Sequence, residues 1–474
     1  MVSVFLNDPR ILQLVGHLDF DKNNHYSVSP FVYSIRTTLG NYLAINTFTS
    51  ALCEISSNIF DLLCKKNVDL SLISENDILT LCRYRFIVNC SEDELKLYTE
   101  TYELLLNLDS QRTGKNRYNI LTTTGCNAQC FYCFENDFIK RAENMTAETA
   151  EKVSKYIIAT AASNNKIYLR WFGGEPLVNT KAIDVICSNM KTNNIDFFSS
   201  VSTNGLLLDN ELLQAAHSKW NLTKVRITLD GYGNEHNIRK NFKGSYHDNA
   251  FEIIMRNIHT IVESGIIMTV RMNIDKNNID SIQLLTEYLI KEFKGCDNFN
   301  VYCRCFFDDL RTEKVSSTKG RLLLNERNKI EDVIISNRMY DWEKMAPNFF
   351  RLHFCAAQDH RKIVILPNGR LCNCECYASD EVSWGCVGND TIDSKVYKYW
   401  NEKEKEIRKR CKNCAFLPLC TPFSRCPMNY IDCKERISHT IELFMKESHY
   451  RYIHKINPIS QIDSIKSRFV FNAP

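Results

Sequence analysis

The sequence lacks the features that would place it in a membrane or outside the cell. It contains no run of 18 or more apolar residues, so no transmembrane helix is predicted. Its N-terminus, MVSVFLNDPR, has no basic segment followed by an apolar stretch, so no signal peptide is expected. With 59 basic and 56 acidic side chains, the net charge of +3 gives no electrostatic reason to expect nucleic acid or a membrane surface as a partner. We therefore predict a soluble, cytoplasmic protein.

Internal repeats and low-complexity segments are absent as well. The 474 residues, of which 44% are hydrophobic, are enough for two or three domains with their own cores. Composition and pattern predict five regions along the chain. These are a small α+β domain (1–105), a barrel (112–310), a helical connector (311–349), a cysteine-rich domain (350–440) and a C-terminal helix with a polar tail (441–474).

The N-terminal region contains short apolar runs separated by polar turns. Strand patterns cover 25–35 and 83–88, and a helix-like stretch covers about 46–64. Mixed strands and helices of this length predict a small independent domain.

Strands and helices alternate regularly from 117 to about 307. This alternation predicts an α/β fold with a parallel sheet of βαβ units, and six units fit a partial barrel better than a closed eightfold one. In such barrels the chemistry lies at the C-terminal ends of the strands. The predicted strands cover 117–123, 166–172, 197–203, 224–230, 268–274 and 299–307, and the predicted helices cover 147–162, 180–191, 209–218, 249–264 and 279–293.

Cysteine is abundant, with 21 residues, ten of which follow residue 350. Because nothing points to secretion, clustered cysteines indicate bound metal rather than disulfides. Six isolated cysteines stand among apolar residues, and we expect them to be small buried hydrophobic residues. They are Cys53, Cys64, Cys82, Cys90, Cys187 and Cys296.

The first predicted barrel strand leads directly into TTTGCNAQCFYC, which places Cys126, Cys130 and Cys133 at the spacing C-x3-C-x2-C. Three thiolates on one short loop can hold three irons of a four-iron cluster and leave the fourth iron open, as a catalytic site requires. The alternatives are a zinc site or three reduced thiols. Zinc usually takes four protein ligands, and no fourth ligand lies on this loop.

These residues resemble the radical S-adenosylmethionine (SAM) superfamily, and within it the group with a C-terminal SPASM domain. The resemblance covers about residues 117–433 and implies a SAM-binding 4Fe–4S cluster on the cysteine loop, with the ring of Tyr132 near the adenine of SAM. At the end of the second strand, WFGGEPL matches the GGE motif of this family, which meets the amino group of SAM. Glycines permit close approach of backbone to a ligand, and the acidic side chain accepts from an ammonium. The matching residues are Gly173, Gly174 and Glu175.

Polar residues at the ends of later strands match further positions of the family. Ser202 and Asn204 resemble residues that contact the ribose, although Asn-Gly is also an ordinary turn signal. Arg271 and Asn273 are expected to contact the SAM carboxylate and ribose.

The fourth strand ends in TLDG, and the resemblance places Asp230 on the substrate side. His236 and Arg239 stand in HNIR, where the family has HDxxR, so the acidic member is missing. Asp230 and His236 are the candidate proton acceptors. Each of these single polar residues has an ordinary packing or solvated role as its alternative.

The C-terminal cysteines match the SPASM spacing with one departure. Cys355, Gly369 and Cys374 read C-x13-G-x4-C around KIVILPNGRL, which predicts a β-hairpin through Pro-Asn-Gly. The next cysteines read C-x2-C-x5-C, but five residues rather than three separate Cys420 from Cys426.

The resemblance implies two auxiliary 4Fe–4S clusters, with one or two zinc sites as the alternative. The first cluster would take Cys355, Cys374 and Cys426 together with one of Cys372, Cys376 and Cys386. The second would take Cys411, Cys414, Cys420 and Cys433.

The chemistry implied by the resemblance is reductive cleavage of SAM to a 5′-deoxyadenosyl radical, which removes hydrogen from an unactivated carbon of the substrate. An electron donor such as flavodoxin or ferredoxin would act as a partner. Relatives that mature ribosomally made peptides often carry a winged-helix-like element before the barrel, which binds the leader of the precursor peptide as an added edge strand. The N-terminal region resembles such an element, and a scaffolding or dimerisation domain is its alternative.

Three functions are consistent with the sequence. The first is a peptide maturase that installs a thioether or another crosslink in a precursor peptide. The second is an anaerobic sulfatase-maturing enzyme that generates formylglycine, against which the long N-terminal extension argues. The third is a non-enzymatic, zinc-binding module.

Overall fold

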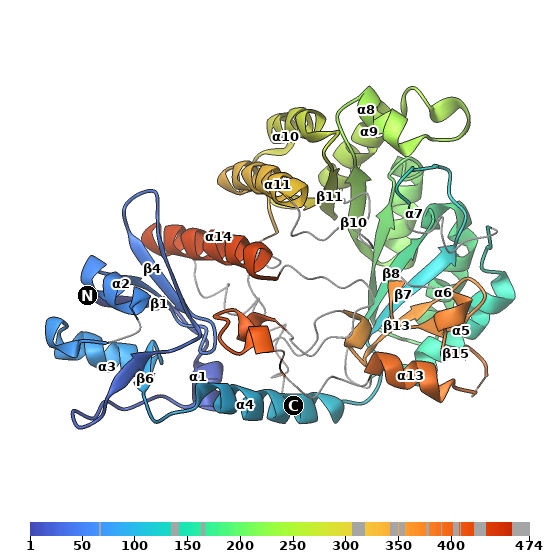
Figure 1. Cartoon of the computed structure of the whole chain (residues 1–474). Coiled ribbons are helices and arrows are strands. Elements are labelled where there is room, and N and C mark those ends of the chain that lie inside the picture. The colour runs from blue at the N-terminus through green and yellow to red at the C-terminus, as the bar shows by residue number, and fades with distance from the viewer. Residues whose placement is uncertain are drawn as a thin grey trace.

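The structure is a computed structural model with an N-terminal α+β part and a larger α/β part (Figure 1). Within the ranges it describes, no helix is both long and apolar enough to cross a lipid bilayer. The described residues are 1–65, 68–133, 142–162, 166–305, 318–341, 349, 356–375, 379–389, 391–401, 407, 409–420 and 433–456.

Six parallel strands form the barrel-like sheet, and their spatial order follows the sequence from β7 to β12. This arrangement confirms the predicted partial barrel of six βα units. The strands are β7 (Arg117–Thr123), β8 (Ile167–Gly173), β9 (Phe197–Thr203), β10 (Leu222–Leu229), β11 (Ile267–Ile274) and β12 (Phe299–Cys305).

Helices connect these strands and cover one face of the sheet (Figure 1). Two of them begin at side-chain caps, since Thr146 accepts a hydrogen bond from the backbone of Thr149, and Asp209 accepts one from Leu212. The short α8 was not predicted. The helices are α5 (Ala147–Thr160), α6 (Thr180–Thr192), α7 (Asn210–Trp220), α8 (Asn234–Lys240), α9 (Ala250–Glu263), α10 (Ile279–Phe293) and, in the predicted connector, α11 (Thr318–Ser336).

The strands alternate between two faces. Val225 and Ile227 of β10, and Val270 and Met272 of β11, are buried in the core between sheet and helices. Because successive side chains of a strand point to opposite faces, the residues between them face the inside of the partial barrel. We call this inner face the lumen.

The predicted hairpin is present and extends the barrel sheet. Strand β13 (Lys362–Ile365) pairs parallel with β7, and β14 (Arg370–Cys372) returns antiparallel to it. A short strand, β15 (Gly385–Cys386), pairs with β14, and α13 (Ser394–Asn401) follows. The cysteine-rich segment is therefore attached to the barrel through backbone hydrogen bonds.

The N-terminal part has a four-stranded antiparallel sheet in the order β1-β5-β4-β3 and a separate two-stranded sheet of β2 and β6. Its strands are β1 (Val2–Leu6), β2 (Tyr26–Val28), β3 (Val32–Arg36), β4 (Tyr42–Asn46), β5 (Leu52–Ile55) and β6 (Ile87–Asn89). Its helices are α1 (Pro9–Val15), α2 (Ser57–Cys64), α3 (Glu75–Arg83) and α4 (Glu94–Ser110), the last of which runs through the predicted boundary at 105.

Two local predictions in this part are wrong. The helix expected over 46–64 begins only at Ser57, because 52–55 form the central strand β5. Both faces of β5 are covered, so its apolar residues show no alternation, and periodicity cannot distinguish such a strand from a helix. The strand expected over 83–88 is displaced to Ile87–Asn89, because the helix α3 extends to Arg83.

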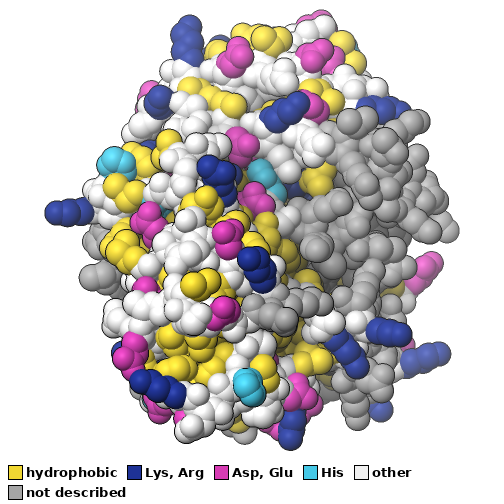
Figure 2. All heavy atoms as spheres, turned by 60° about the vertical axis from the view of Figure 1, so that its left-hand side comes forward, with side chains coloured by type: hydrophobic (Ala, Val, Ile, Leu, Met, Phe, Trp, Pro, Cys, Tyr) yellow, Lys and Arg dark blue, Asp and Glu magenta, His cyan; other side chains and the backbone are white. Residues whose placement is uncertain are grey.

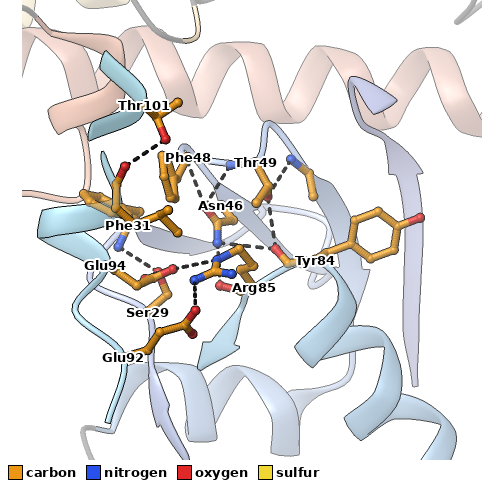
Figure 3. A network of polar contacts seen from close by, with 12 residues as sticks. Ser29, Phe31, Asn46, Phe48, Thr49, Tyr84, Arg85, Glu92, Glu94 and Thr101 are labelled. Carbon is orange, nitrogen blue, oxygen red and sulfur yellow. Dashed lines mark hydrogen bonds and ion pairs between the residues drawn. The ribbon is translucent and has the colours of Figure 1, made fainter. Parts of the chain in front are cut away.

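A buried ion pair organises the centre of this part (Figure 3). Arg85 Nε lies 3.0 Å from Glu94 Oε1, and its guanidinium also contacts Glu92 at 2.9 Å. Arg85 has a positive φ of 58°, and its carbonyl accepts a hydrogen bond from the Asn46 side chain at 2.5 Å. Ser29 donates to Glu94 as well. These bonds tie the start of α4 to the end of β4.

The hydrophobic core of the N-terminal part includes residues from the other end of the chain. Helix α14 (Cys433–Ile453) buries Phe444 and Met445 against Leu43 and Tyr98. Tyr33 donates a 2.6 Å hydrogen bond to Glu442 on the same helix. Residues 1–105 therefore share one core with α14, whereas a second core, which includes Ile59 and Leu81, lies entirely within them. On the face turned forward in Figure 2, hydrophobic side chains lie between charged residues of both signs.

The isolated cysteines differ from one another in burial. Cys53, Cys82 and Cys187 are buried, as predicted, and Cys296 is half-buried. Cys64 and Cys90 are exposed, so for these two the prediction is wrong. Cys64 is the last residue of α2 and Cys90 directly follows β6, and at the end of an element an apolar neighbourhood in sequence does not ensure burial.

Candidate active site

The loop that follows β7 carries Cys126, Cys130 and Cys133, and all three side chains are half-buried. Its start is fixed by the backbone of Gly125, which donates to Thr123 Oγ1 at 2.8 Å. Burial raises the pKa of the Cys126 thiol to about 12, so a metal must displace its proton. No other thiol, acid or histidine stands between Cys126 and Cys133, and this all-thiol donor set is the one iron–sulfur clusters take.

No group of three His, Cys, Asp or Glu side chains in the described ranges is arranged to hold a single metal ion. In a cluster each thiolate binds a different iron, so the cysteines need not converge on one point. Asn127, also on the loop, has a buried side-chain nitrogen without a hydrogen-bond partner in the described structure. This donor is available to a bound group, so the residues present fit a cluster and its ligand.

Gly173 and Gly174 bring the end of β8 against this loop. A Cβ on Gly174 would lie 2.4 Å from the carbonyl oxygen of Gly125, and one on Gly173 would lie 2.1 Å from that of Thr123. The same backbones are joined by a 2.9 Å hydrogen bond from Glu175 N to Gly125 O. Both glycines therefore serve the contact of the strand end with the cysteine loop.

Glu175 is fully buried at the same strand end. Its carboxylate accepts hydrogen bonds from Thr203 Oγ1 at 2.7 Å, Asn204 N at 2.8 Å and Leu177 N at 3.2 Å. Burial raises the pKa of Glu175 to about 7, against the effect of these donors. A nearby ammonium favours the ionised form, so the position suits the predicted contact with the amino group of SAM.

Asn204 also reaches the cysteine loop, because its Nδ2 donates to Asn127 Oδ1 at 2.6 Å. Ser202 lies two residues earlier, within β9, and its hydroxyl accepts hydrogen bonds from Arg170 at 3.1 and 3.3 Å. The two predicted ribose contacts are thus separated: the structure brings Asn204 to the loop and pairs Ser202 with Arg170.

Asp230 forms a second buried cluster beside the loop. Lys240 Nζ lies 3.1 Å from its carboxylate and 2.8 Å from Tyr132 Oη, and Tyr132 donates to Asp230. Asn273 Nδ2 donates to the other carboxylate oxygen at 3.0 Å. Burial opposes ionisation, but Lys240 lowers the pKa of Asp230, and Asp230 in turn raises the pKa of Lys240 well above its usual value. Both groups are therefore charged.

Lys240 is a residue that the sequence analysis missed. It directly follows HNIR, and its place on α8, a helix that was not predicted, turns it toward Asp230. Its position next to a family motif is the signal that could have identified it.

His236 is fully buried, and its Nδ1 accepts a hydrogen bond from the backbone of Asp230 at 3.2 Å. Burial, together with the charge of Lys240, lowers the pKa of His236 to about 3. This environment opposes protonation near neutral pH, against the predicted role of proton acceptor. Arg239 forms an ion pair with Asp275 and is not in the Asp230 cluster.

Arg271 lies on β11, two residues before Asn273, and its Nε donates to Asn273 Oδ1 at 2.8 Å. Burial lowers the pKa of Arg271. The two residues predicted to contact SAM are thus coupled to each other and, through Asn273, to Asp230.

Glu375 was also missed. It follows Cys374 directly and enters the lumen, where Arg170 lies 3.0 Å and Lys362 3.4 Å from its carboxylate. Although burial opposes it, these two cations lower the pKa of Glu375 to about 2. The contact joins the cysteine-rich segment to the inside of the barrel.

The C-terminal cysteines fall into two described groups. Cys372 is buried in a small apolar cluster with Leu121, Val364 and Leu366, which favours a packing role over the predicted metal ligand. Cys374 and Cys386 are half-buried near the hairpin. Cys411, Cys414 and Cys420 lie at the N-terminal part, where Cys411 and Cys414 pack against its core. Cys355, Cys376 and Cys426 lie outside the described residues, as does the side chain of Cys433.

A model of the radical SAM superfamily matches residues 120–289, which contain the cysteine loop, Glu175 and the Asp230 cluster. Residues 120–289 of this chain are thus similar to the radical SAM superfamily of enzymes. This similarity implies SAM and a 4Fe–4S cluster as cofactors, and it favours an enzyme over a zinc-bound module.

The radical SAM cyclopropyl synthase TigE of Paramaledivibacter caminithermalis is 24% identical over 300 residues, covering 56% of this chain and 61% of TigE. The match therefore spans less than two thirds of that relative. The cysteine-type anaerobic sulfatase-maturating enzyme of Clostridium novyi is 27% identical over 336 residues, covering 63% of this chain and 84% of the relative. The solved structure of anSMEcpe with bound AdoMet has a TM-score of 0.53 at 18% identity, covers 74% of this chain and 98% of that chain, and shares the fold.

Proposed function

We propose that this protein is a radical SAM peptide maturase that modifies a ribosomally made precursor peptide. The observation that carries the proposal is the meeting of the cysteine loop with Glu175 and with the Asp230 cluster at the C-terminal ends of the barrel strands. In barrels of parallel strands this end is where catalysis takes place.

Cys126, Cys130 and Cys133 would hold the 4Fe–4S cluster, whose open iron binds SAM. When bound, cluster and SAM supply an electron and a carbon radical that removes hydrogen from the substrate. Glu175 accepts from the amino group of SAM, and Asn204 lies beside the loop to contact the ribose. A flavodoxin or ferredoxin is the proposed electron donor.

The remaining residues of the site hold its shape and charge. Lys240 and Asp230 form a buried pair, and the pair fixes the hydroxyl of Tyr132. Because Lys240 stays protonated, it is no base. Asp230 remains the proposed proton acceptor, and its pairing with Lys240, which lowers its pKa, makes it a weak base until that pair is broken. Arg271 and Asn273 line the same end of the lumen and are the proposed contacts of the SAM carboxylate and ribose.

Auxiliary clusters would bind to the C-terminal cysteines. Cys374 and Cys386 flank the hairpin that extends the barrel sheet, and Cys411, Cys414 and Cys420 lie at the N-terminal part. Since Cys372 is packed among apolar residues, we favour Cys376 or Cys386 as the fourth ligand of the first cluster.

The N-terminal part supports a peptide substrate. Strands β1 and β3 are the edges of its four-stranded sheet, and an extended peptide can add to such an edge. AnSMEcpe has been solved with bound AdoMet and Cp18Cys peptide, so a related fold accepts a peptide. We propose that β3 receives the leader of the precursor peptide.

A sulfatase-maturing activity is the second candidate, supported by the 84% coverage of the Clostridium novyi relative. The match with anSMEcpe uses nearly all of that chain but only 74% of this one. The additional part in this chain favours the peptide maturase.

The test begins with iron and sulfide per chain after anaerobic reconstitution of the whole protein. Three four-iron clusters give about 12 irons, and the C126A/C130A/C133A variant retains about 8. The protein is then incubated with SAM, a reductant and the short peptides encoded beside its gene, and the masses of the peptides are measured by mass spectrometry. A mass change that needs the three cysteines supports a maturase. The proposal is contradicted if the protein forms formylglycine in a sulfatase peptide and leaves all peptides encoded beside its gene unchanged.

A further inference from the structure

The lumen carries a row of cationic side chains on neighbouring strands. In each of these strands, the strand residues adjacent to the cation are buried on the opposite face, under the helices, so the cation itself faces the lumen. The cations are Arg170 on β8, Arg226 on β10, Arg271 on β11 and Lys362 on β13. Charges inside a partial barrel are expensive unless they are paired with groups of the protein or of a ligand.

Most of these cations have a partner in the protein. Arg170 and Lys362 share Glu375. Arg271 donates to Asn273. Arg226 has no hydrogen-bond or ion-pair partner among the residues that the structure describes, and its Nε is buried.

The residue beside Arg226 is unsatisfied too. Thr269 is its register partner on β11, is fully buried, and has a hydroxyl without a partner in the described part of the chain. Leaving a buried polar atom unpaired destabilises the fold, and buried polar groups are nearly always hydrogen-bonded. Two unpaired donors on paired residues of the lumen indicate a bound group.

The position of this pair is below the SAM end of the barrel. Arg226 lies on β10 and precedes Asp230, the first residue after that strand, by four residues, which corresponds to roughly 13 Å of extended chain. Its neighbour across β9 is Ser202, which Arg170 already holds. A molecule that reaches from the cysteine loop into the lumen would therefore place its far end at Arg226 and Thr269.

We propose that Arg226 and Thr269 bind a carboxylate of the substrate. The planar guanidinium matches a carboxylate with two parallel hydrogen bonds, and the Thr269 hydroxyl can donate to a remaining lone pair. With peptides as the substrate class, which rests on the proposed function, the carboxylate belongs to an acidic side chain or to the C-terminus of the peptide. Arg226 is thus a positioning residue that sets which carbon of the peptide faces the SAM end.

The test uses the whole reconstituted protein and four synthetic probes in calorimetric titrations. Two are five-residue peptides capped at both ends, with glutamate or glutamine in the middle and glycine elsewhere. The third is pentaglycine, acetylated, with a free C-terminal carboxylate. The fourth is N-acetylglutamate amide. SAM is titrated separately into each variant.

We expect wild type to bind the glutamate peptide or the free-carboxylate peptide at least tenfold more tightly than the glutamine peptide, and the one favoured identifies the source of the carboxylate. R226Q should abolish this preference, R226K should keep part of it, and T269V should reduce it. R256Q, on the exposed surface of α9, should behave as wild type. Affinity for SAM should be the same in all variants, and retained iron content shows that each has folded.

Equal binding of the glutamate, glutamine and free-carboxylate peptides by wild type would overturn the proposal, as would an unchanged preference in R226Q. A lower affinity of R226Q for SAM with the preference intact would assign Arg226 to the SAM carboxylate and also overturn it. If N-acetylglutamate amide binds through Arg226 while no peptide binds, the carboxylate site stands and the peptide maturase fails.

Discussion

At the scale of single residues, the site is built from buried charges that compensate one another. Lys240 with Asp230 and Glu375 with Arg170 and Lys362 are ion pairs in which burial alone would suppress the charges. Arg170 and Glu375 are 205 residues apart, and Lys240 meets Asp230 only because α8 turns it back toward the end of β10, so no local pattern predicted these pairs. Cys126, Cys130, Cys133 and Glu175 were predictable because each belongs to a short motif at a strand end.

Removing one member of the Lys240–Asp230 pair should be costly. K240M leaves the Asp230 carboxylate buried without its cation, and we expect the free energy of unfolding to fall by about 3–5 kcal/mol. Urea unfolding followed by tryptophan fluorescence measures the change. K155M, on the exposed face of α5, is the matched control. A loss no larger than that of K155M would show that the pair contributes little.

His236 should make stability depend on pH. Its pKa is lowered to about 3 in the folded protein, whereas an unfolded histidine titrates near 6.5. Between these values the unfolded chain binds the extra proton, so stability falls as pH decreases below 6.5, by up to about 1.4 kcal/mol per pH unit.

Urea unfolding of wild type, H236N and H217N between pH 7 and 5 measures this effect. An asparagine can still accept the hydrogen bond from Asp230 N, so H236N should lose this contribution to the slope. H217N changes an exposed histidine of α7 and should retain it. If the free energy of unfolding fell equally with decreasing pH in wild type and H236N, the proposed contribution of His236 would be contradicted.

At the scale of elements, the end of β8 supports the cysteine loop through two glycines. The sequence predicted both strand ends, but it assigned the close approach of the glycines to a ligand. The structure shows backbone against backbone, a contact that depends on the parallel pairing of β7 with β8.

G174A should therefore disturb the loop, because the added Cβ would lie 2.4 Å from the Gly125 carbonyl oxygen. We expect loss of about four irons per chain and a lower absorbance near 400 nm after reconstitution. G265A introduces a side chain at a positive φ of 79° but meets no atom within 4 Å, so it should keep its iron. Full iron content in G174A would show that the cysteine loop moves to accommodate the added methyl group and still binds its cluster.

At the scale of the whole molecule, the two ends of the chain share one core. Helix α14 lies against the N-terminal sheet, and the segment with Phe416 and Leu417 completes the contact (Figure 1). A cysteine group is thereby held beside the part proposed to bind the leader peptide.

F444A should destabilise the N-terminal part together with α14. Phe444 is fully buried, and its truncation leaves a cavity that costs about 3–5 kcal/mol. Hydrogen exchange should rise in β3, β4 and α14 while β7 to β11 stay protected. K446A, exposed on the same helix, should leave exchange unchanged. Faster exchange confined to α14 would mean that the N-terminal sheet is stable alone.

The sequence by itself determined the partial barrel, because each βα unit has its own periodicity, and it determined the cysteine loop and the GGE segment, because their spacing is local. Only the tertiary structure decided the rest. Glu375 and Arg226 acquire their surroundings from strands distant in sequence, and the separation of Arg170 from Glu375 is 205 residues. Lys240 reaches Asp230 and Tyr132 only because α8 folds back over the strand ends. Burial and charge pairing depend on which segments contact one another in the folded protein, and the sequence pattern does not predict those contacts.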